Sequence, residues 1–191
     1  MNKTITSRKK YHSALFQVIT SILILSFVNS VDAVSASIPA QEENFISIIS
    51  QAQSDAKNAD NDMQKGGVKA RRDKAICSLM ANKSVKNWVG KVRKIGANSD
   101  GKGVLEITLA KGITVKTWNN DFSDMQSRTL LDPNSKLFQT ASSLKKGESV
   151  TFSGTFLPGK DGECIYEGSM SLSGKLRDPE FIFRFSGIST N

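Results

Sequence analysis

Hydrophobic and polar residues alternate with a period of two over most of the chain beyond residue 85. Leu105, Ile107 and Leu109 alternate with polar neighbours, and Ile113 and Val115 continue the pattern after a short break. Such alternation is typical of half-buried strands, with every second side chain turned to the core. The same pattern predicts strands over 85–95, 104–109, 113–116, 150–156 and 181–185. Turn residues at Ser99-Asp100-Gly101 and Lys111-Gly112 join the first three.

Helical spacing of the apolar residues is confined to the segments before and between these strands. A polar, amphipathic stretch predicts a helix over 41–63, Gly66-Gly67 interrupts it, and a second helix follows over 68–80. A short helix is expected between 133 and 146. The segment 164–172 is expected to add a hairpin arm to the last two strands.

Three strands, a short helix and two further strands is the order of the OB-fold, a Greek-key barrel that binds oligonucleotides and oligosaccharides. We therefore predict a mainly β chain with an N-terminal α extension: a five-stranded OB-fold barrel with a short helix between strands 3 and 4. The expected organisation is a signal peptide over 1–36, a helical extension over 37–82 and the barrel over 83–191.

Several short motifs in the barrel region resemble one known family. The residues that carry the likeness are Trp88-Val89-Gly90, Thr117-Trp118-Asn119-Asn120, Thr129-Leu130-Leu131-Asp132, Ser135-Lys136-Leu137-Phe138, and the segments 150–156 and 179–185. Together they resemble the tRNA-anticodon-like OB-fold family of bacterial exported proteins, over residues 68–188. The resemblance implies the fold. It assigns no activity, so no functional residue is carried over from it.

The N-terminus has the three parts of a secretory signal. Basic residues at Lys3 and 8–10 precede a mostly apolar run over 14–28, and small residues follow. The run is shorter than the roughly 20 residues that a membrane-spanning helix needs. We therefore expect export to the periplasm or secretion, with cleavage after Ala33 or Ala36. A retained N-terminal anchor is the alternative.

The only histidine of the chain is His12, inside the predicted signal. The mature chain then lacks the commonest general base and the commonest metal ligand. Serine–histidine and cysteine–histidine nucleophiles are excluded, as are zinc sites of mixed cysteine and histidine type. We expect no enzyme, no cofactor and no metal, and a small hydrolase is a remote alternative.

Both cysteines, Cys77 and Cys164, belong to the mature chain. In an oxidising compartment, an isolated pair without C-x-x-C spacing favours a structural disulfide over a redox site. Two buried thiols are the alternative.

A basic run and a tryptophan suggest a ligand face. Ten lysines and arginines lie between Lys65 and Lys94, opposed only by Asp73. Such a run can contact phosphates or acidic glycans, although it more often forms a solvated helix face. If Ile113 and Val115 point inward, strand alternation turns the later side chains of that strand outward, where OB domains stack bases on aromatic residues. The predicted ligand-binding residues are Lys116, Trp118, Arg71, Arg72 and Lys91.

The function that these observations favour is an exported, non-enzymatic OB-fold binding or adaptor module of the bacterial envelope. Its partner would be an envelope protein or an anionic ligand. The alternative is a periplasmic single-stranded nucleic-acid-binding protein that serves DNA uptake or transfer. Of 26 basic and 18 acidic residues, four and one respectively lie before residue 37, so the mature surplus is five positive charges. That surplus is compatible with either function.

Export predicts a shortened chain. The intact mass of the protein recovered from the periplasm should correspond to a start at Val34 or Ser37, because cleavage follows a small residue. A full-length species found only in the cytoplasm would contradict this prediction.

Overall fold

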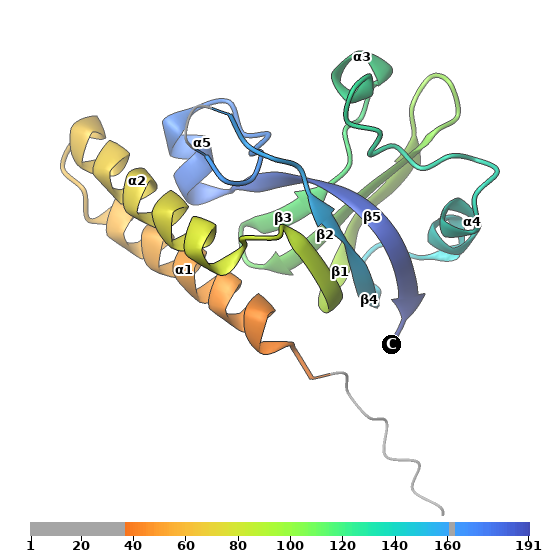
Figure 1. The fold of residues 1–191 in the computed structure, drawn as a ribbon, viewed down its shortest axis with the longest axis horizontal. Coiled ribbons are helices and arrows are strands. Elements are labelled where there is room, and N and C mark those ends of the chain that lie inside the picture. Colours follow the sequence, from red (N-terminus) through yellow and green to blue (C-terminus); the bar gives the residue numbers. More distant parts are fainter. Residues whose placement is uncertain (1–36, 161–162) are drawn as a thin grey trace, which may run out of the picture. The chain divides into compact units, whose positions relative to one another are not determined.

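Five strands close into a barrel in the order β1-β2-β3-β5-β4. The computed structural model describes residues 37–160 and 163–191 (Figure 1). The strands β3 and β5 pair in parallel and every other neighbouring pair is antiparallel. This is the predicted OB-fold order. The strands are β1 (Ser84–Ala97), β2 (Gly103–Ala110), β3 (Ile113–Lys116), β4 (Ser149–Phe156) and β5 (Glu180–Thr190).

The period of two places one side of each strand in the core. Ile113 and Val115 of β3 have no exposed surface, as predicted, and Val150, Phe152 and Phe156 are buried along β4. Four of the five strands follow the predicted bounds to within a few residues, and β5 continues further, to Thr190. The β2–β3 turn lies at Lys111-Gly112, as predicted.

Two long helices precede the barrel, but the break between them is not where the glycines predict it. Helix α1 (Ala40–Lys57) ends before the expected position, and α2 (Asp62–Leu79) runs straight through Gly66-Gly67. The side chain of Asn61 caps α2 by accepting a hydrogen bond from the Gln64 N–H. A helical glycine costs only about 1 kcal/mol, and burial of the apolar face of α2 outweighs that cost.

Three short helices complete the part of the chain that the structure describes. Helix α4 (Lys136–Ser143) is the predicted helix between β3 and β4, and the Ser135 hydroxyl caps it. Helix α3 (Asp121–Asp124) was not predicted. The predicted hairpin arm is wrong, because the segment forms only isolated bridges followed by α5 (Leu172–Arg177).

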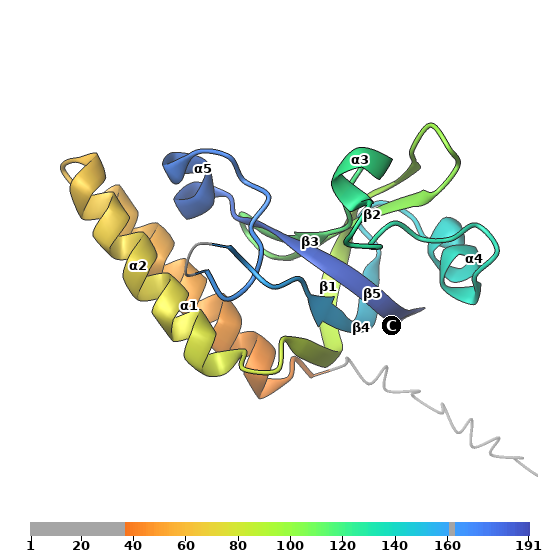
Figure 2. The ribbon, with the colours of Figure 1, turned by 45° about the horizontal axis from the view of Figure 1, so that its top comes forward.

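Helix α1 covers one end of the barrel. Phe45 has no exposed surface, and its ring lies 5.2 Å from that of Trp88 and 5.3 Å from those of Phe156 and Phe181. These partners stand near the start of β1, the end of β4 and the start of β5, which the strand pairing places at the same end of the barrel. Figure 2 shows α2 lying antiparallel alongside α1.

A disulfide joins α2 to the long β4–β5 connection. Cys77 and Cys164 are bonded, with their Cα atoms 5.2 Å apart, as predicted. The bond closes a loop across a sequence separation of 87 residues. A loop of that length is expected to stabilise the fold by about 4.6 kcal/mol in the chain-entropy model.

The predicted signal peptide and its cleavage sites lie outside the described residues. The described residues belong to one compact unit, and the main hydrophobic core consists of residues within it. Among the described residues, no helix is long and apolar enough to cross a membrane.

One carboxyl group is buried where α1 meets β1. Glu42 has no exposed surface, and its Oε2 accepts a hydrogen bond of 2.8 Å from the Val89 N–H. Its Oε1 has no hydrogen-bond partner among the described residues. Burial raises the pKa of Glu42 to about 7, against the opposing effect of the Val89 hydrogen bond.

Glu42→Gln should therefore stabilise the protein at neutral and alkaline pH. The folded chain holds the Glu42 proton more tightly than the unfolded chain, so Glu42 favours folding most below pH 4.5 and this contribution is lost as the pH rises to about 7. Across this pH range, the contribution of Glu42 to the free energy of unfolding falls by about 3 kcal/mol. Urea unfolding across this range should show the variant gaining stability relative to the parent as pH rises.

Glu43→Gln is the matched control, because Glu43 is exposed beside it on α1. Parallel pH profiles for the parent chain and Glu42→Gln would contradict the raised pKa.

Candidate functional site

A cleft of about 650 Å³ opens where the two N-terminal helices, the β2–β3 turn and α5 meet. We call it the helix–barrel cleft. Residues from all four elements line it, including Gln53, Ala56, Lys57, Lys65, Lys111 and Leu176. It lies at the end of the barrel that α1 covers.

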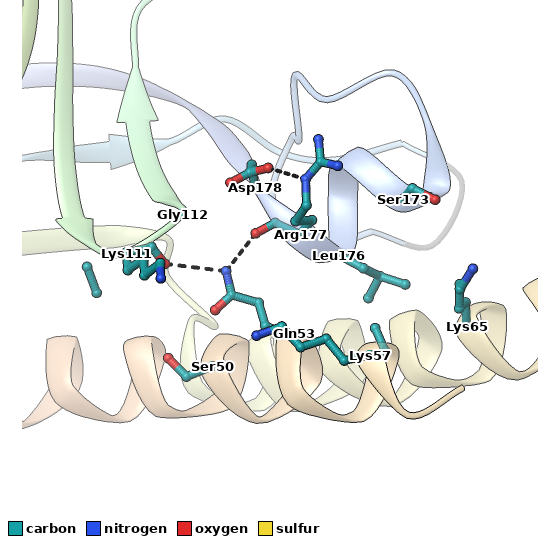
Figure 3. Close-up of a pocket in the computed structure, with 12 residues that line it drawn as sticks. Ser50, Gln53, Lys57, Lys65, Lys111, Gly112, Ser173, Leu176, Arg177 and Asp178 are labelled. Carbon is teal, nitrogen blue, oxygen red and sulfur yellow. Dashed lines mark hydrogen bonds and ion pairs between the residues drawn. The ribbon is translucent and has the colours of Figure 1, made fainter. Parts of the chain in front are cut away.

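Gln53 fixes the relative positions of three of these elements. Its side-chain Nε2 donates to the Arg177 carbonyl oxygen at 2.9 Å and approaches the Lys111 carbonyl oxygen at 3.5 Å. Figure 3 shows the amide reaching from α1 between the turn and α5. One side chain therefore ties the helical extension to the turn and to the last residue of α5, and this tie shapes the cleft.

Gly112 allows the turn to approach α5 closely. Its φ of +71° lies in the left-handed region, and a Cβ atom there would lie 2.8 Å from the Arg177 carbonyl oxygen and 3.0 Å from Gln53 Nε2. A residue with a side chain would strain the backbone and collide with both. The cleft therefore requires glycine at this position.

The cleft combines an apolar floor with a cationic rim. Leu176 is buried with Ala52 and Val68 in a small second core, and Ala56 packs against it. Lys57 and Lys111 stand on opposite sides of the opening, one on α1 and one on the β2–β3 turn (Figure 3). Among the described residues neither lysine has an ion-pair partner, whereas Lys65 pairs with Asp62 at 3.0 Å.

The acidic residue of the cleft is already neutralised. Asp178 Oδ2 accepts a hydrogen bond of 2.5 Å from Arg177 Nε, and the guanidinium points away from the helices in Figure 3. The described part of the chain holds no group of three or more metal-ligating side chains. This arrangement can attract an anion and shelter an apolar group beside it.

Charged side chains on the predicted ligand face pair with one another. Lys116 points outward from β3, as alternation predicts, but its Nζ lies 2.5 Å from Glu180 Oε2. Arg93 pairs with the other oxygen of Glu180 at 3.0 Å. Burial raises the pKa of Glu180, but the hydrogen bonds and charges of Lys116 and Arg93 outweigh it and hold the pKa below its usual value. The positive charges of Lys116 and Arg93 are therefore partly neutralised by Glu180.

Trp118 is half-buried and not an open stacking platform. Its ring packs edge-on against Tyr166 at 5.5 Å, and its Nε1 donates to the Ser127 hydroxyl at 3.3 Å. The residues that cover it come from the β4–β5 connection and the segment after α3, not from the N-terminal helices.

Arg72 does not contribute to an exposed groove, which corrects the prediction. It is buried, and its guanidinium pairs with Glu167 and Asp73, each at 2.7 Å, and donates to the Lys175 carbonyl oxygen. Arg71 is exposed on α2, and Lys91 is exposed on β1 beside Thr108 and Ser149. The structure shows no contact that joins these cations to Trp118.

Sequence reasoning missed the residues of the helix–barrel cleft. Gln53 and Arg177 are separated by 124 positions, and no local pattern links them. The one available signal was Lys111-Gly112, which predicts the turn but not its contact with α5.

Gly112→Ala should lower the free energy of unfolding more than Gly101→Ala does. Both glycines have positive φ, +71° and +76°, so the backbone strain is similar in the two variants, at about 1 kcal/mol. Only at Gly112 would the new methyl group collide with neighbours, because nothing lies within 4 Å of a Cβ at Gly101. Urea denaturation should show about 1 to 2 kcal/mol of additional loss. Equal losses would contradict the close approach of the turn to α5.

Comparison of the chain with protein-family models, with curated proteins and with solved structures finds no match. The residues and contacts of the chain itself are therefore the basis for assigning its function.

Proposed function

We propose that this protein is an exported, non-enzymatic binding module of the bacterial envelope, and that its ligand is an anion with an apolar part. The observation that carries this proposal is the helix–barrel cleft, where Lys57 and Lys111 flank the apolar floor around Leu176. Lys57 and Lys111 are exposed at the opening, and their two positive charges attract an anion to it. The apolar part of the ligand gains by burial against the floor.

Export and the lack of catalysis rest on separate observations. The disulfide between Cys77 and Cys164 is typical of proteins in oxidising compartments, and the N-terminal pattern is that of a secretory signal. Residues 37–191 contain no histidine, which supports a binding role over a hydrolytic one. The resemblance to exported OB-fold proteins points the same way.

Single-stranded nucleic acid is the weaker alternative. On the predicted ligand face, base stacking would require Trp118, and its ring packs against Tyr166. Of the cations predicted to contact phosphates there, Lys116 and Arg72 are paired with carboxylates.

The proposal predicts that octanoate binds residues 34–191 in the helix–barrel cleft. Amide chemical shifts in a titration with octanoate should move at Lys111 and Gly112, and 1-octanol should cause smaller shifts because it lacks the charge. Lys57→Gln and Lys111→Gln should each weaken binding of octanoate by roughly two- to fivefold, as expected for an exposed ion pair.

Lys145→Gln is the control, because Lys145 is exposed on the connection between α4 and β4, away from the cleft. Equal binding of the acid and the alcohol, or shifts spread over the barrel with none at the cleft, would contradict the proposal.

A further inference from the structure

Helix α3 presents two large apolar side chains to solvent. Phe122 is 86% exposed within α3, and Met125, the residue that follows the helix, is 71% exposed. Removing an apolar side chain of this size from water is favourable, so its exposure leaves that free energy available for binding. Phe122 and Met125 therefore form a small apolar patch that protrudes into solvent.

The polar residues of this helix hold it rigidly in place. The Asp124 carboxylate is buried and accepts hydrogen bonds from the Thr129 N–H, the Thr129 hydroxyl and the Leu130 N–H, at 2.6, 2.7 and 3.1 Å. Asp121 pairs with Lys102 and Asn98 of the β1–β2 connection. The usual arrangement is thus reversed, because the carboxylates of α3 contact the protein and its apolar side chains face outward.

Two arginines lie beside this apolar patch. Arg128 and Arg184 line a shallow hollow of about 580 Å³ together with Met125 and Gln126. The Arg184 guanidinium donates twice to the Ser127 carbonyl oxygen, which orients it without neutralising it. Neither arginine pairs with a carboxylate within the described residues, in contrast to Arg72 and Arg93.

We propose that α3 and these two arginines bind the surface of an anionic phospholipid membrane. Phe122 and Met125 enter the boundary between headgroups and acyl chains, and Arg128 and Arg184 contact lipid phosphates. Protruding apolar side chains flanked by cations are suited to a fluid anionic layer, which adapts to their shape. This site is separate from the helix–barrel cleft and does not depend on the ligand proposed there.

A folded protein partner is less well supported. A specific protein interface buries about 800 Å² on each partner, and the exposed side chains of Phe122 and Met125 fall well short of that area.

The test is sedimentation of residues 34–191 with lipid vesicles. This part of the chain forms a compact unit with its own core, so it can be studied without the N-terminal apolar run. We expect binding to vesicles of phosphatidylcholine mixed with phosphatidylglycerol, and much weaker binding to phosphatidylcholine alone. Phe122→Ala should lower the partition coefficient roughly tenfold. Arg128→Gln and Arg184→Gln should each lower it about fivefold.

Matched controls are available at distant exposed positions. Met63 and Met170 are 90% and 97% exposed, so Met63→Ala and Met170→Ala remove similar apolar surface outside the patch and should leave vesicle binding unchanged. Because Phe122 is exposed, its replacement should leave thermal unfolding unchanged, and this measurement separates lost binding from lost folding.

Three results would overturn the proposal: no binding to either vesicle, equal binding to both, or undiminished binding of Phe122→Ala. Complete release of the protein from vesicles by soluble glycerol phosphate would also overturn it, because the apolar side chains would then contribute nothing.

Discussion

The packing of Phe45 against the end of the barrel is the contact on which the rest of the molecule depends. Its ring meets Trp88, Phe156 and Phe181, so one side chain of α1 touches three strands. Aromatic contacts of this kind add about 0.5 to 1.5 kcal/mol each beyond the burial of their area. Because this contact positions α1, it also positions Gln53 two turns later, and with it the helix–barrel cleft. The buried Glu42 is a cost of the same packing.

Helix α2 is held by a second set of contacts, with the β4–β5 connection and α5. The disulfide attaches its C-terminal half to the β4–β5 connection, and Lys69 and Lys175 share Glu163 at 2.7 Å each. Arg72 and Glu167 form a buried pair beside them. Such a pair adds little net stability but is costly to break, so it favours one arrangement of α2 over others. The helical extension is therefore an integral part of the fold.

The fold was more predictable than the site, for physical reasons. A barrel with one buried face imposes a period of two that Ile113, Val115 and the phenylalanines of β5 show directly. The break between α1 and α2 was misplaced because tertiary burial overrides the weak preference of Gly66-Gly67. A pair such as Arg72 and Glu167, 95 positions apart, cannot be inferred from the residues next to either one in the sequence. The basic run therefore suggested a groove, where the structure shows that Arg72 is buried and paired.

The cations of the two proposed sites lie in different parts of the fold. Cations of the basic run such as Lys69, Arg72 and Arg93 are paired with carboxylates, whereas Lys57 and Lys111 flank the cleft and Arg128 and Arg184 stand beside α3. The β2–β3 turn lies at one end of β3 and α3 follows the other end, so the two places are at opposite ends of that strand (Figure 1). A protein held at a membrane through α3 would therefore keep the helix–barrel cleft open to the surrounding solution.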